Sequence, residues 1–215
     1  SSGENLKKHL TEPLEKIMNA YEALKDKGRV FAYRKAITAL KTYPKKIETV
    51  DEAKALYGIG PSMKQKIQEI LTTGELRQAK AMSKNERVQV VEMFAKIWGM
   101  GVETANKLYE QGYRTLDQLR ENQHLLTNWQ KIGLKYYDDF QHRYTRAEIE
   151  EMWGIVKAKV DEISEVKGLY EATVVGSYRR GRETCGDLDV CFTRKDGGRH
   201  NGFLNRLVKS LKGTF

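Results

Sequence analysis

Two short segments of this chain repeat one glycine pattern, and the repeat strongly limits how the residues around it can fold. The first covers residues 56–64 (LYGIGPSMK), and the second covers residues 97–105 (IWGMGVETA). In each copy an apolar residue lies between two glycines, and a stretch suited to a helix follows. Pro61 stands where the first of these helices would begin, a position that favours proline. The repeat therefore predicts two glycine turns, each of which opens a helix.

The glycines of the two turns are suited to holding a phosphate backbone. Glycine lets a turn approach a bulky group closely, and the free N–H groups at a helix N-terminus favour an anion. The pattern is that of a helix-hairpin-helix element, and Lys64, Lys66 and Lys107 add positive charge nearby. The alternative is a plain turn between helices, with glycines as caps only. Two copies in a basic chain favour contact with the DNA backbone, which carries little sequence information.

The composition is compatible with such a partner. The 215 residues include 38 Lys and Arg against 29 Asp and Glu, which gives a net charge of +9. A positive balance permits a nucleic-acid partner but does not require one. No apolar run approaches the roughly 18 residues of a membrane-spanning helix, so no membrane partner is expected. Cys185 and Cys191 are too few for a disulfide framework, and no Cys/His cluster has the spacing of a zinc site.

Apolar spacing predicts a helical first part and a mixed last part. Residues three or four apart predict four short helices before residue 100 and a longer helix over residues 147–166. The first two helices are defined by Leu14, Ile17, Met18, Tyr21, Leu24, Phe31, Ile37 and Leu40. β-Branched stretches then predict strands over residues 172–175 and 188–193. The sequence therefore predicts a helical region followed by the beginning of an α+β domain.

Residues 176–189 carry the strongest indication of catalysis. Asp187 and Asp189 lie one residue apart in a predicted strand, so both carboxylates would face the same side. Two such carboxylates can share a pair of divalent ions, as phosphoryl transfer requires. Upstream, Gly176 and Ser177 begin a turn whose N–H groups and hydroxyl suit a triphosphate. An Asp-x-Asp pair alone is usually a solvated strand edge, but Gly-Ser followed shortly by Gly-Asp-x-Asp is the signature of the nucleotidyltransferase fold.

Taken in order, these motifs resemble the X family of DNA polymerases, especially its eukaryotic beta and lambda types. The matching segments are residues 32–36 (AYRKA), both hairpins, residues 132–140 (IGLKYYDDF) and residues 176–189. The resemblance implies an α+β chain of three domains. These are a helical lyase domain over residues 4–81, a fingers domain over residues 82–146, and part of a nucleotidyltransferase palm over residues 147–215. The first two domains would each contain one helix-hairpin-helix.

In this family the first domain binds the 5′ side of a DNA gap, and in repair members it removes a 5′-deoxyribose phosphate. The resemblance implies that Lys66 forms a Schiff base with the sugar, and nearby cations or partial burial would lower its pKa for this role. Without the resemblance, Lys66 reads as a solvated helix lysine. Gly28 replaces a base-stacking side chain and Gln65 replaces a glutamate, and both departures would weaken this activity. The implied DNA-binding residues are Arg29, Tyr33, Lys35, Gly58, Gly60, Lys64, Gly99 and Gly101.

The resemblance also implies roles for residues of the palm. Asp187 and Asp189 match the first two metal-binding aspartates of the family, which would hold Mg²⁺ or Mn²⁺. The implied contacts to the incoming nucleotide's phosphates are Arg146, Ser177, Arg180 and Gly186. The implied reaction is attack of a primer 3′-hydroxyl on the α-phosphate of a deoxynucleotide, with release of pyrophosphate.

Backbone carbonyls of the two hairpins are implied ligands of a monovalent cation, Na⁺ or K⁺. The matching carbonyls belong to Lys54, Leu56, Ile59, Ala95, Ile97 and Met100. The resemblance further implies gapped or nicked double-stranded DNA, deoxynucleoside triphosphates and proteins of a repair complex as partners. It also implies a nuclear location.

The family's palm needs a third aspartate on a later strand, and no residue here matches it, because Asp196 comes too early. We therefore expect little gap-filling synthesis by these 215 residues alone. Two other functions stay open. One is a non-enzymatic module that binds gapped DNA or DNA ends, and the other is a template-independent terminal nucleotidyltransferase.

Overall fold

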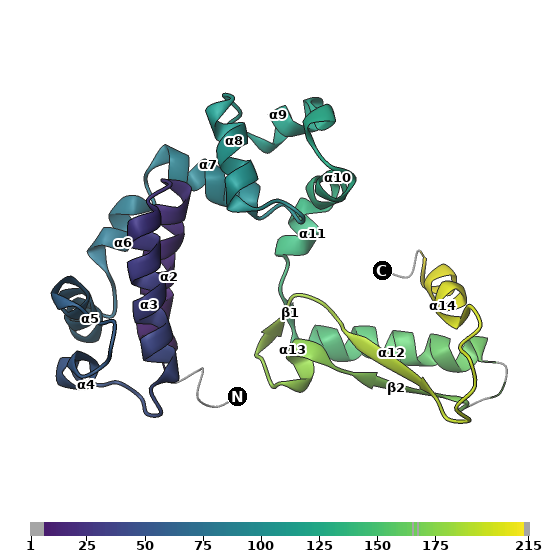
Figure 1. Ribbon diagram of the computed structural model, residues 1–215. Helices are drawn as coiled ribbons and strands as arrows, with labels where there is room; N and C mark the ends of the chain where they lie inside the picture. The colour runs from purple at the N-terminus through teal and green to yellow at the C-terminus, as the bar shows by residue number, and fades with distance from the viewer. Residues whose placement is uncertain (1–6, 165, 167, 213–215) are drawn as a thin grey trace. The chain divides into compact units, whose positions relative to one another are not determined.

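The structure is a computed structural model that describes residues 7–164, 166 and 168–212 (Figure 1). The chain divides into two compact units, Ser1–Tyr137 and Asp138–Phe215. In the described part of the chain, no helix is long and apolar enough to cross a membrane. The predicted domain bounds at residues 81 and 146 stay a prediction, and residues 4–6, 165, 167 and 213–215 of the predicted domains lie outside the described residues.

The first unit is helical. Its elements are α2 Lys8–Ala23, α3 Lys27–Thr42, α4 Val50–Lys54, α5 Pro61–Thr73, α6 Arg77–Met82, α7 Glu86–Ala95, α8 Val102–Glu110, α9 Leu116–Glu121, η1 Gln123–Leu125 and α10 Asn128–Lys135. Several starts follow from capping side chains, because a side-chain oxygen satisfies an N–H group of the first turn. Asp26 caps α3, and capping boxes of Thr49 and Thr127 open α4 and α10.

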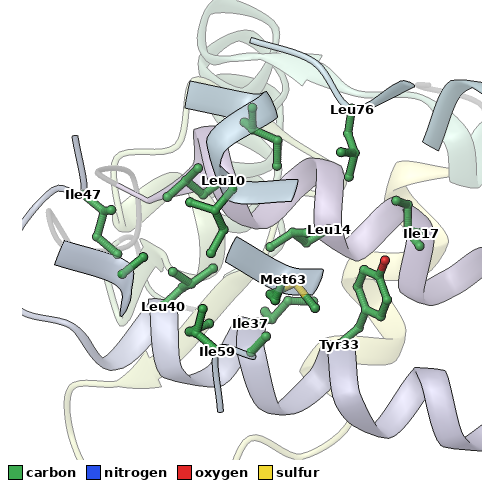
Figure 2. Close-up of a cluster of buried hydrophobic side chains, with 14 of the residues drawn as sticks. Leu10, Leu14, Ile17, Tyr33, Ile37, Leu40, Ile47, Ile59, Met63 and Leu76 are labelled. Atoms are coloured by element: carbon green, nitrogen blue, oxygen red, sulfur yellow. The ribbon is translucent and has the colours of Figure 1, made fainter. Parts of the chain in front are cut away.

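Two hydrophobic cores lie within this unit. The first joins α2, α3 and α5, and Figure 2 shows Leu14, Ile37 and Met63 meeting there. The second gathers residues from α7 to α10 around Phe94 and Ile97. Ala20 and Ala23 on the last turn of α2 pack into this second core, so one helix contributes to both.

A buried polar contact also ties the second core to α2. The guanidinium of Arg87 on α7 donates to Oδ1 of Asn106 on α8, from Nε at 3.0 Å and from Nη2 at 2.7 Å. The same Nε lies 3.0 Å from the carbonyl oxygen of Ala23. Because Asn106 is almost fully buried, its amide oxygen needs this partner.

The second unit combines helices with two small antiparallel sheets. Its elements are α11 Tyr137–Gln141, which leads into it, β1 Tyr144–Thr145, α12 Arg146–Ile163, β2 Tyr170–Val174, α13 Gly176–Arg179, β3 Thr184–Cys185, β4 Val190–Arg194 and α14 Phe203–Leu211. Strand β2 pairs with β4, and β1 pairs with β3. The core joins α12, α14 and the β2–β4 pair, where the rings of Tyr170 and Phe203 stack with centroids 3.7 Å apart. The α+β class predicted from the sequence is confirmed.

The predicted helices and strands are present, but two residues and one helix end were placed wrongly. Phe31 was expected on the apolar side of α3, yet its side chain is 68% exposed. Leu24 lies one residue beyond the end of α2 and is also exposed. The long helix ends at Ile163 instead of Val166, because the backbone of Ser164 is extended and the helix cannot continue through it.

Candidate nucleic-acid interface and nucleotide loop

The first hairpin joins α4 to α5 through a left-handed glycine. Gly58 has a φ of +100°, a conformation that side chains rarely tolerate. The N–H of Ile59 donates to the carbonyl of Leu56 at 3.2 Å, which closes the turn. Gly60 then takes an extended conformation and caps α5, and its carbonyl accepts from the N–H of Lys64 at 3.0 Å. Pro61 occupies the first helical position, as predicted.

The second hairpin joins α7 to α8 and repeats this arrangement 41 residues later. Gly99 has a φ of +82°, and the N–H of Met100 donates to the carbonyl of Ile97 at 2.9 Å. The carbonyl of Gly101 accepts from the N–H of Ala105 at 3.0 Å. Ile59 and Met100, the residues between the glycines, are both buried. The predicted repeat of two glycine turns is therefore confirmed at the level of the main chain.

The neighbours that support the two turns differ. The aliphatic chain of Lys35 packs against Gly58, where a Cβ would lie 3.0 Å from its Cγ. In the second turn, Trp129 occupies the same place, and Nε2 of Gln130 donates to the carbonyl of Gly99 at 3.1 Å. Helix α10 approaches the hairpin so closely that a Cβ on Gly133 would lie 2.5 Å from the carbonyl oxygen of Trp98.

The predicted lyase residues lie on α3 and α5. Nζ of Lys66 donates to Oγ of Ser62, one helical turn earlier, at 2.9 Å. The guanidinium of Arg29 is 2.7 Å from a carboxylate oxygen of Asp26. Tyr33 is buried next to the ring of Tyr21, and this burial raises the pKa of its phenol far above the ordinary value. The roles predicted for Lys66, Arg29 and Tyr33 stay predictions.

The loop predicted to bind a triphosphate brings two of its residues together. A Cβ on Gly176 would meet the carboxylate of Asp189, so this carboxylate lies directly against the backbone that opens α13. The N–H of Val175 donates to the carbonyl of Asp189 at 2.9 Å, one residue beyond the β2–β4 ladder. Both aspartates are exposed. The expectation that both lie inside a strand is wrong, because β4 begins at Val190 and Asp187 lies in a bend.

The other predicted nucleotide contacts surround α13. Oγ of Ser177 is buried and has no hydrogen-bond partner within the described residues. Arg180 and Gly186 are exposed. Nη1 of Arg146 donates to the carbonyls of Tyr178 at 3.0 Å and Arg182 at 3.2 Å, so here it holds the loop itself. The contacts of these residues with a triphosphate stay predictions.

Tyr178 and Glu150 were not identified from the sequence. The hydroxyl of Tyr178 donates to Oε1 of Glu150 on α12 at 2.7 Å, and this hydrogen bond raises the pKa of the phenol. The Arg146 guanidinium lies 4.0 Å from the centre of the same ring. Arg146 and Glu150 are one helical turn apart, which is the only sequence signal that they act together on the loop.

Family comparisons cover both hairpins and the loop. The family model described as "Helix-hairpin-helix domain" matches residues 5–76, "Fingers domain of DNA polymerase lambda" matches residues 92–141, and "DNA polymerase beta palm" matches residues 143–214. The "DNA polymerase lambda" of Arabidopsis thaliana is 44% identical over 210 residues, which cover 97% of this chain and 39% of that protein. The "DNA polymerase lambda" of Rattus norvegicus is 41% identical over 208 residues, 97% of this chain and 35% of that protein.

The chain belongs to the X family of DNA polymerases. The resemblance expected from the motifs is thus confirmed. The chain spans less than half the length of these curated relatives. Each hairpin lies inside a different matched segment, and the Gly176–Asp189 loop lies inside the palm match.

A polymerase of this family implies a divalent metal, and the donor set agrees with one. Asp187 and Asp189 offer exposed carboxylate oxygens, which are the ligands that Mg²⁺ prefers. Within the described ranges, no group of three or more His, Cys, Asp or Glu side chains is placed to hold a metal ion. The two aspartates therefore fit part of a metal site. In the hairpins, Leu56 and Ile97 each accept one main-chain hydrogen bond, and a carbonyl keeps a second lone pair for a cation.

Proposed function

We propose that this chain forms the DNA-binding and nucleotide-binding part of a DNA-directed DNA polymerase that fills gaps during DNA repair. The observation that carries the proposal is the contact of the Asp189 carboxylate with Gly176, beside the buried hydroxyl of Ser177, which has no hydrogen-bond partner among the described residues. Carboxylate oxygens of Asp189 therefore lie close to the Ser177 hydroxyl, whose hydrogen-bonding capacity is unused among the described residues. Such an arrangement suits a metal-bound triphosphate.

In the proposed polymerase reaction, Asp187 and Asp189 hold the divalent ions, Mg²⁺ or Mn²⁺. Bound there, these ions would lower the pKa of the primer 3′-hydroxyl and neutralise phosphate charge. The N–H groups that open α13 and the Ser177 hydroxyl would bind phosphate oxygens of the deoxynucleoside triphosphate. The exposed guanidinium of Arg180 would add a charge-assisted contact. Arg146 and Gly186 complete the proposed nucleotide-binding set.

The two hairpins are the proposed binding sites for the backbone of gapped or nicked double-stranded DNA. Their N–H groups, with Lys35 and Lys64, would bind phosphates, and such contacts are independent of sequence. The carbonyls of Lys54, Leu56 and Ile59, and those of Ala95, Ile97 and Met100, would hold Na⁺ or K⁺. A nuclear location and proteins of a repair complex belong to the same proposal.

We assign the accompanying 5′-deoxyribose-phosphate lyase step to Lys66. Its neutral amine would attack C1′ of the ring-opened sugar and release water as the Schiff base forms. Loss of a C2′ proton then breaks the bond to the 3′ phosphate oxygen by β-elimination. Ser62, 2.9 Å from Nζ, is positioned to orient this amine.

Gap filling by the whole polymerase that contains this chain tests the first activity. Asp189→Asn should lower nucleotide insertion into a one-nucleotide gap by at least 100-fold while the affinity for the gapped DNA stays unchanged. Asp196→Asn is the matched control, because this exposed carboxylate pairs with Arg194 in the same unit. Normal insertion by Asp189→Asn would exclude Asp189 from the proposed metal site, whereas a parent protein that binds the gapped DNA without inserting a nucleotide would favour the non-enzymatic DNA-binding module.

Borohydride trapping on a 5′-deoxyribose-phosphate substrate tests the lyase. The parent chain should form a covalent adduct, and Lys66→Ala should lose it. Lys80→Ala serves as the control, since Lys80 is an exposed helix lysine paired with Glu75. An equal adduct yield from Lys66→Ala would contradict the assignment.

A further inference from the structure

A cavity of about 650 Å³ lies between α3 and the first hairpin, and it is lined by two exposed aromatic side chains. Phe31 of α3 is 68% exposed, and Tyr57 of the hairpin is 86% exposed. Arg34, Lys35 and Thr38 line the same cavity. Large aromatic side chains that gather at one exposed place usually mark an interaction site.

The exposure of Tyr57 is not required by the packing of the hairpin. Leu56 and Ile59, on either side of Tyr57 and Gly58, already supply the apolar contacts to the first core. The Tyr57 ring instead lies under the ammonium group of Lys35, whose Nζ is 4.1 Å from the ring centre. This cation covers one region of the ring and places positive charge at the edge of the cavity.

The second hairpin shows what the same position does when a neighbour fills it. Trp98 is the equivalent of Tyr57, and its ring meets Trp129 edge-on with centroids 5.1 Å apart. Trp98 is only 49% exposed. In the described part of the chain no aromatic ring packs against Tyr57, so the cavity beside the first hairpin is the open one.

We propose that this cavity binds one unpaired nucleobase of the DNA held by the first hairpin. The proposal rests on the DNA-binding function proposed above. The base would pack against Tyr57 and Phe31, while Arg34 and Lys35 face its phosphate and Thr38 offers a hydroxyl. Stacking of this kind tolerates any base, because every base has a π-face. The volume also falls within the range of small-ligand pockets.

Charge and position favour a nucleotide over an apolar partner segment. The cavity lies directly beside Gly58, where the hairpin would hold a phosphate. Consecutive nucleotides of one strand would therefore place a phosphate at the turn and the adjoining base in the cavity. Two cationic side chains at an aromatic cavity match the combination that binds single-stranded nucleic acid.

Binding of the full chain to two labelled DNAs tests this site. One is a gapped duplex that carries a single unpaired nucleotide on the 5′ side of the gap. The other is a fully paired duplex of the same length. Tyr57→Ala should weaken binding to the first about tenfold and leave binding to the second unchanged, whereas Tyr57→Trp should retain it. The matched control is Tyr136→Ala, because Lys135 covers that ring in the same way, at 5.0 Å.

2-Aminopurine at the unpaired position gives a direct readout of stacking. Its fluorescence should be quenched by the parent chain and restored by Tyr57→Ala, with unchanged circular dichroism as the check on folding. If Tyr57→Ala lowers the affinity equally for both DNAs, or for neither, the nucleobase site is overturned, while the proposed phosphate binding by the hairpin is not. If the parent chain binds neither DNA, the DNA-binding proposal itself fails, and this site with it.

Discussion

The two hairpins have the same main-chain geometry but are held in place by different neighbours. In the first, a flexible lysine side chain covers the left-handed glycine. In the second, Trp129 covers that glycine, and the backbone of Trp98 lies against Gly133 of α10. The shared part is therefore the set of main-chain hydrogen bonds and glycine conformations. The side chains that pack around this shared main chain are flexible in the first copy and rigid in the second. The two copies are therefore expected to respond differently to mutation.

The electrostatic surroundings of the two copies also differ. Helix α5 has no acidic residue in its first turn, whereas α8 has Glu103, paired with Lys107 at 3.7 Å. An acid near a helix N-terminus competes with a bound anion. The first hairpin should therefore bind phosphate more strongly than the second.

Gly133→Ala should have the largest effect. A Cβ there would lie 2.5 Å and 2.6 Å from backbone atoms of Trp98, which cannot move away cheaply. Overpacking of this kind costs about 2–3 kcal/mol of unfolding free energy. Hydrogen exchange of the Trp98 and Met100 amides measures it locally. Gly154→Ala in α12 is the control, because among the described residues no atom beyond the neighbouring backbone of its own helix would lie within 4 Å of the new Cβ, and it should stabilise its helix slightly.

Alanine at the left-handed glycines should separate the two copies next. Gly58→Ala and Gly99→Ala each force a residue into a left-handed conformation, at a cost of about 1–2 kcal/mol. The cost should be larger at Gly99, where Trp129 leaves little room, than at Gly58, where Lys35 can swing aside. Chemical denaturation of both variants measures their losses of unfolding free energy, and hydrogen exchange of the hairpin amides shows where each loss occurs. The reverse order would show that Lys35 supports its turn as firmly as Trp129 does.

Exchanging the acidic residue between the copies should change DNA affinity modestly. Glu103→Gln should strengthen binding to duplex DNA about two- to threefold, because the N-terminus of α8 then no longer carries a carboxylate that competes with phosphate. Ser62→Glu, the same change in reverse at the equivalent position of α5, should weaken it by a similar factor. Fluorescence anisotropy at low salt measures both. If neither variant shifts the affinity, the helix N-termini do not contact phosphate.

The smallest expected effect concerns pH. Glu92 and Asp51 occupy equivalent positions of the two copies, yet burial raises the pKa of Glu92 while the Lys54 hydrogen bond lowers that of Asp51. A raised pKa means that Glu92 supports the fold below its ordinary pKa of 4.5, and that this support is lost as pH rises through the folded value.

Glu92→Gln should consequently melt about 1–2 °C higher than the parent at pH 7. The difference should shrink as pH falls below the ordinary pKa of 4.5, because Glu92 then becomes protonated in both the folded and unfolded states. Asp51→Asn should show the opposite sign at pH 7, because it removes a favourable ionised group. Melting curves between pH 4 and pH 8 distinguish the two. A difference that is independent of pH would contradict the burial of the Glu92 carboxylate.

Local rules predicted the hairpins because their shape is encoded locally. A left-handed turn needs Gly58 or Gly99, and Pro61 marks the start of the helix that follows. The supports could not be predicted in this way. The contact between Trp98 and Gly133 joins residues far apart in the chain, and no local pattern reports such packing.

The loop of the second unit shows the same limit. β-Branched residues around Asp189 suggested a strand that includes both aspartates, and period two then placed them on one face. The chain instead bends at Asp187, and Asp189 lies against Gly176. The hydrogen bond between Tyr178 and Glu150 was missed because it joins residues on different elements. Exposure of Phe31 and burial of Tyr33 likewise depend on how α2 and α5 cover α3.

The recurrence of the same main-chain hydrogen bonds also explains how little the two copies share in sequence. Over residues 56–64 and 97–105, only the two glycines are identical. A turn closed by main-chain N–H and carbonyl groups tolerates almost any side chain that leaves its shape unchanged. Apart from the two glycines, each copy therefore tolerates different side chains, and one can accept an exposed tyrosine and the other a packed tryptophan without loss of the turn. A repeat that is encoded in the main chain can therefore carry unlike side chains at its surface while both turns keep the same shape.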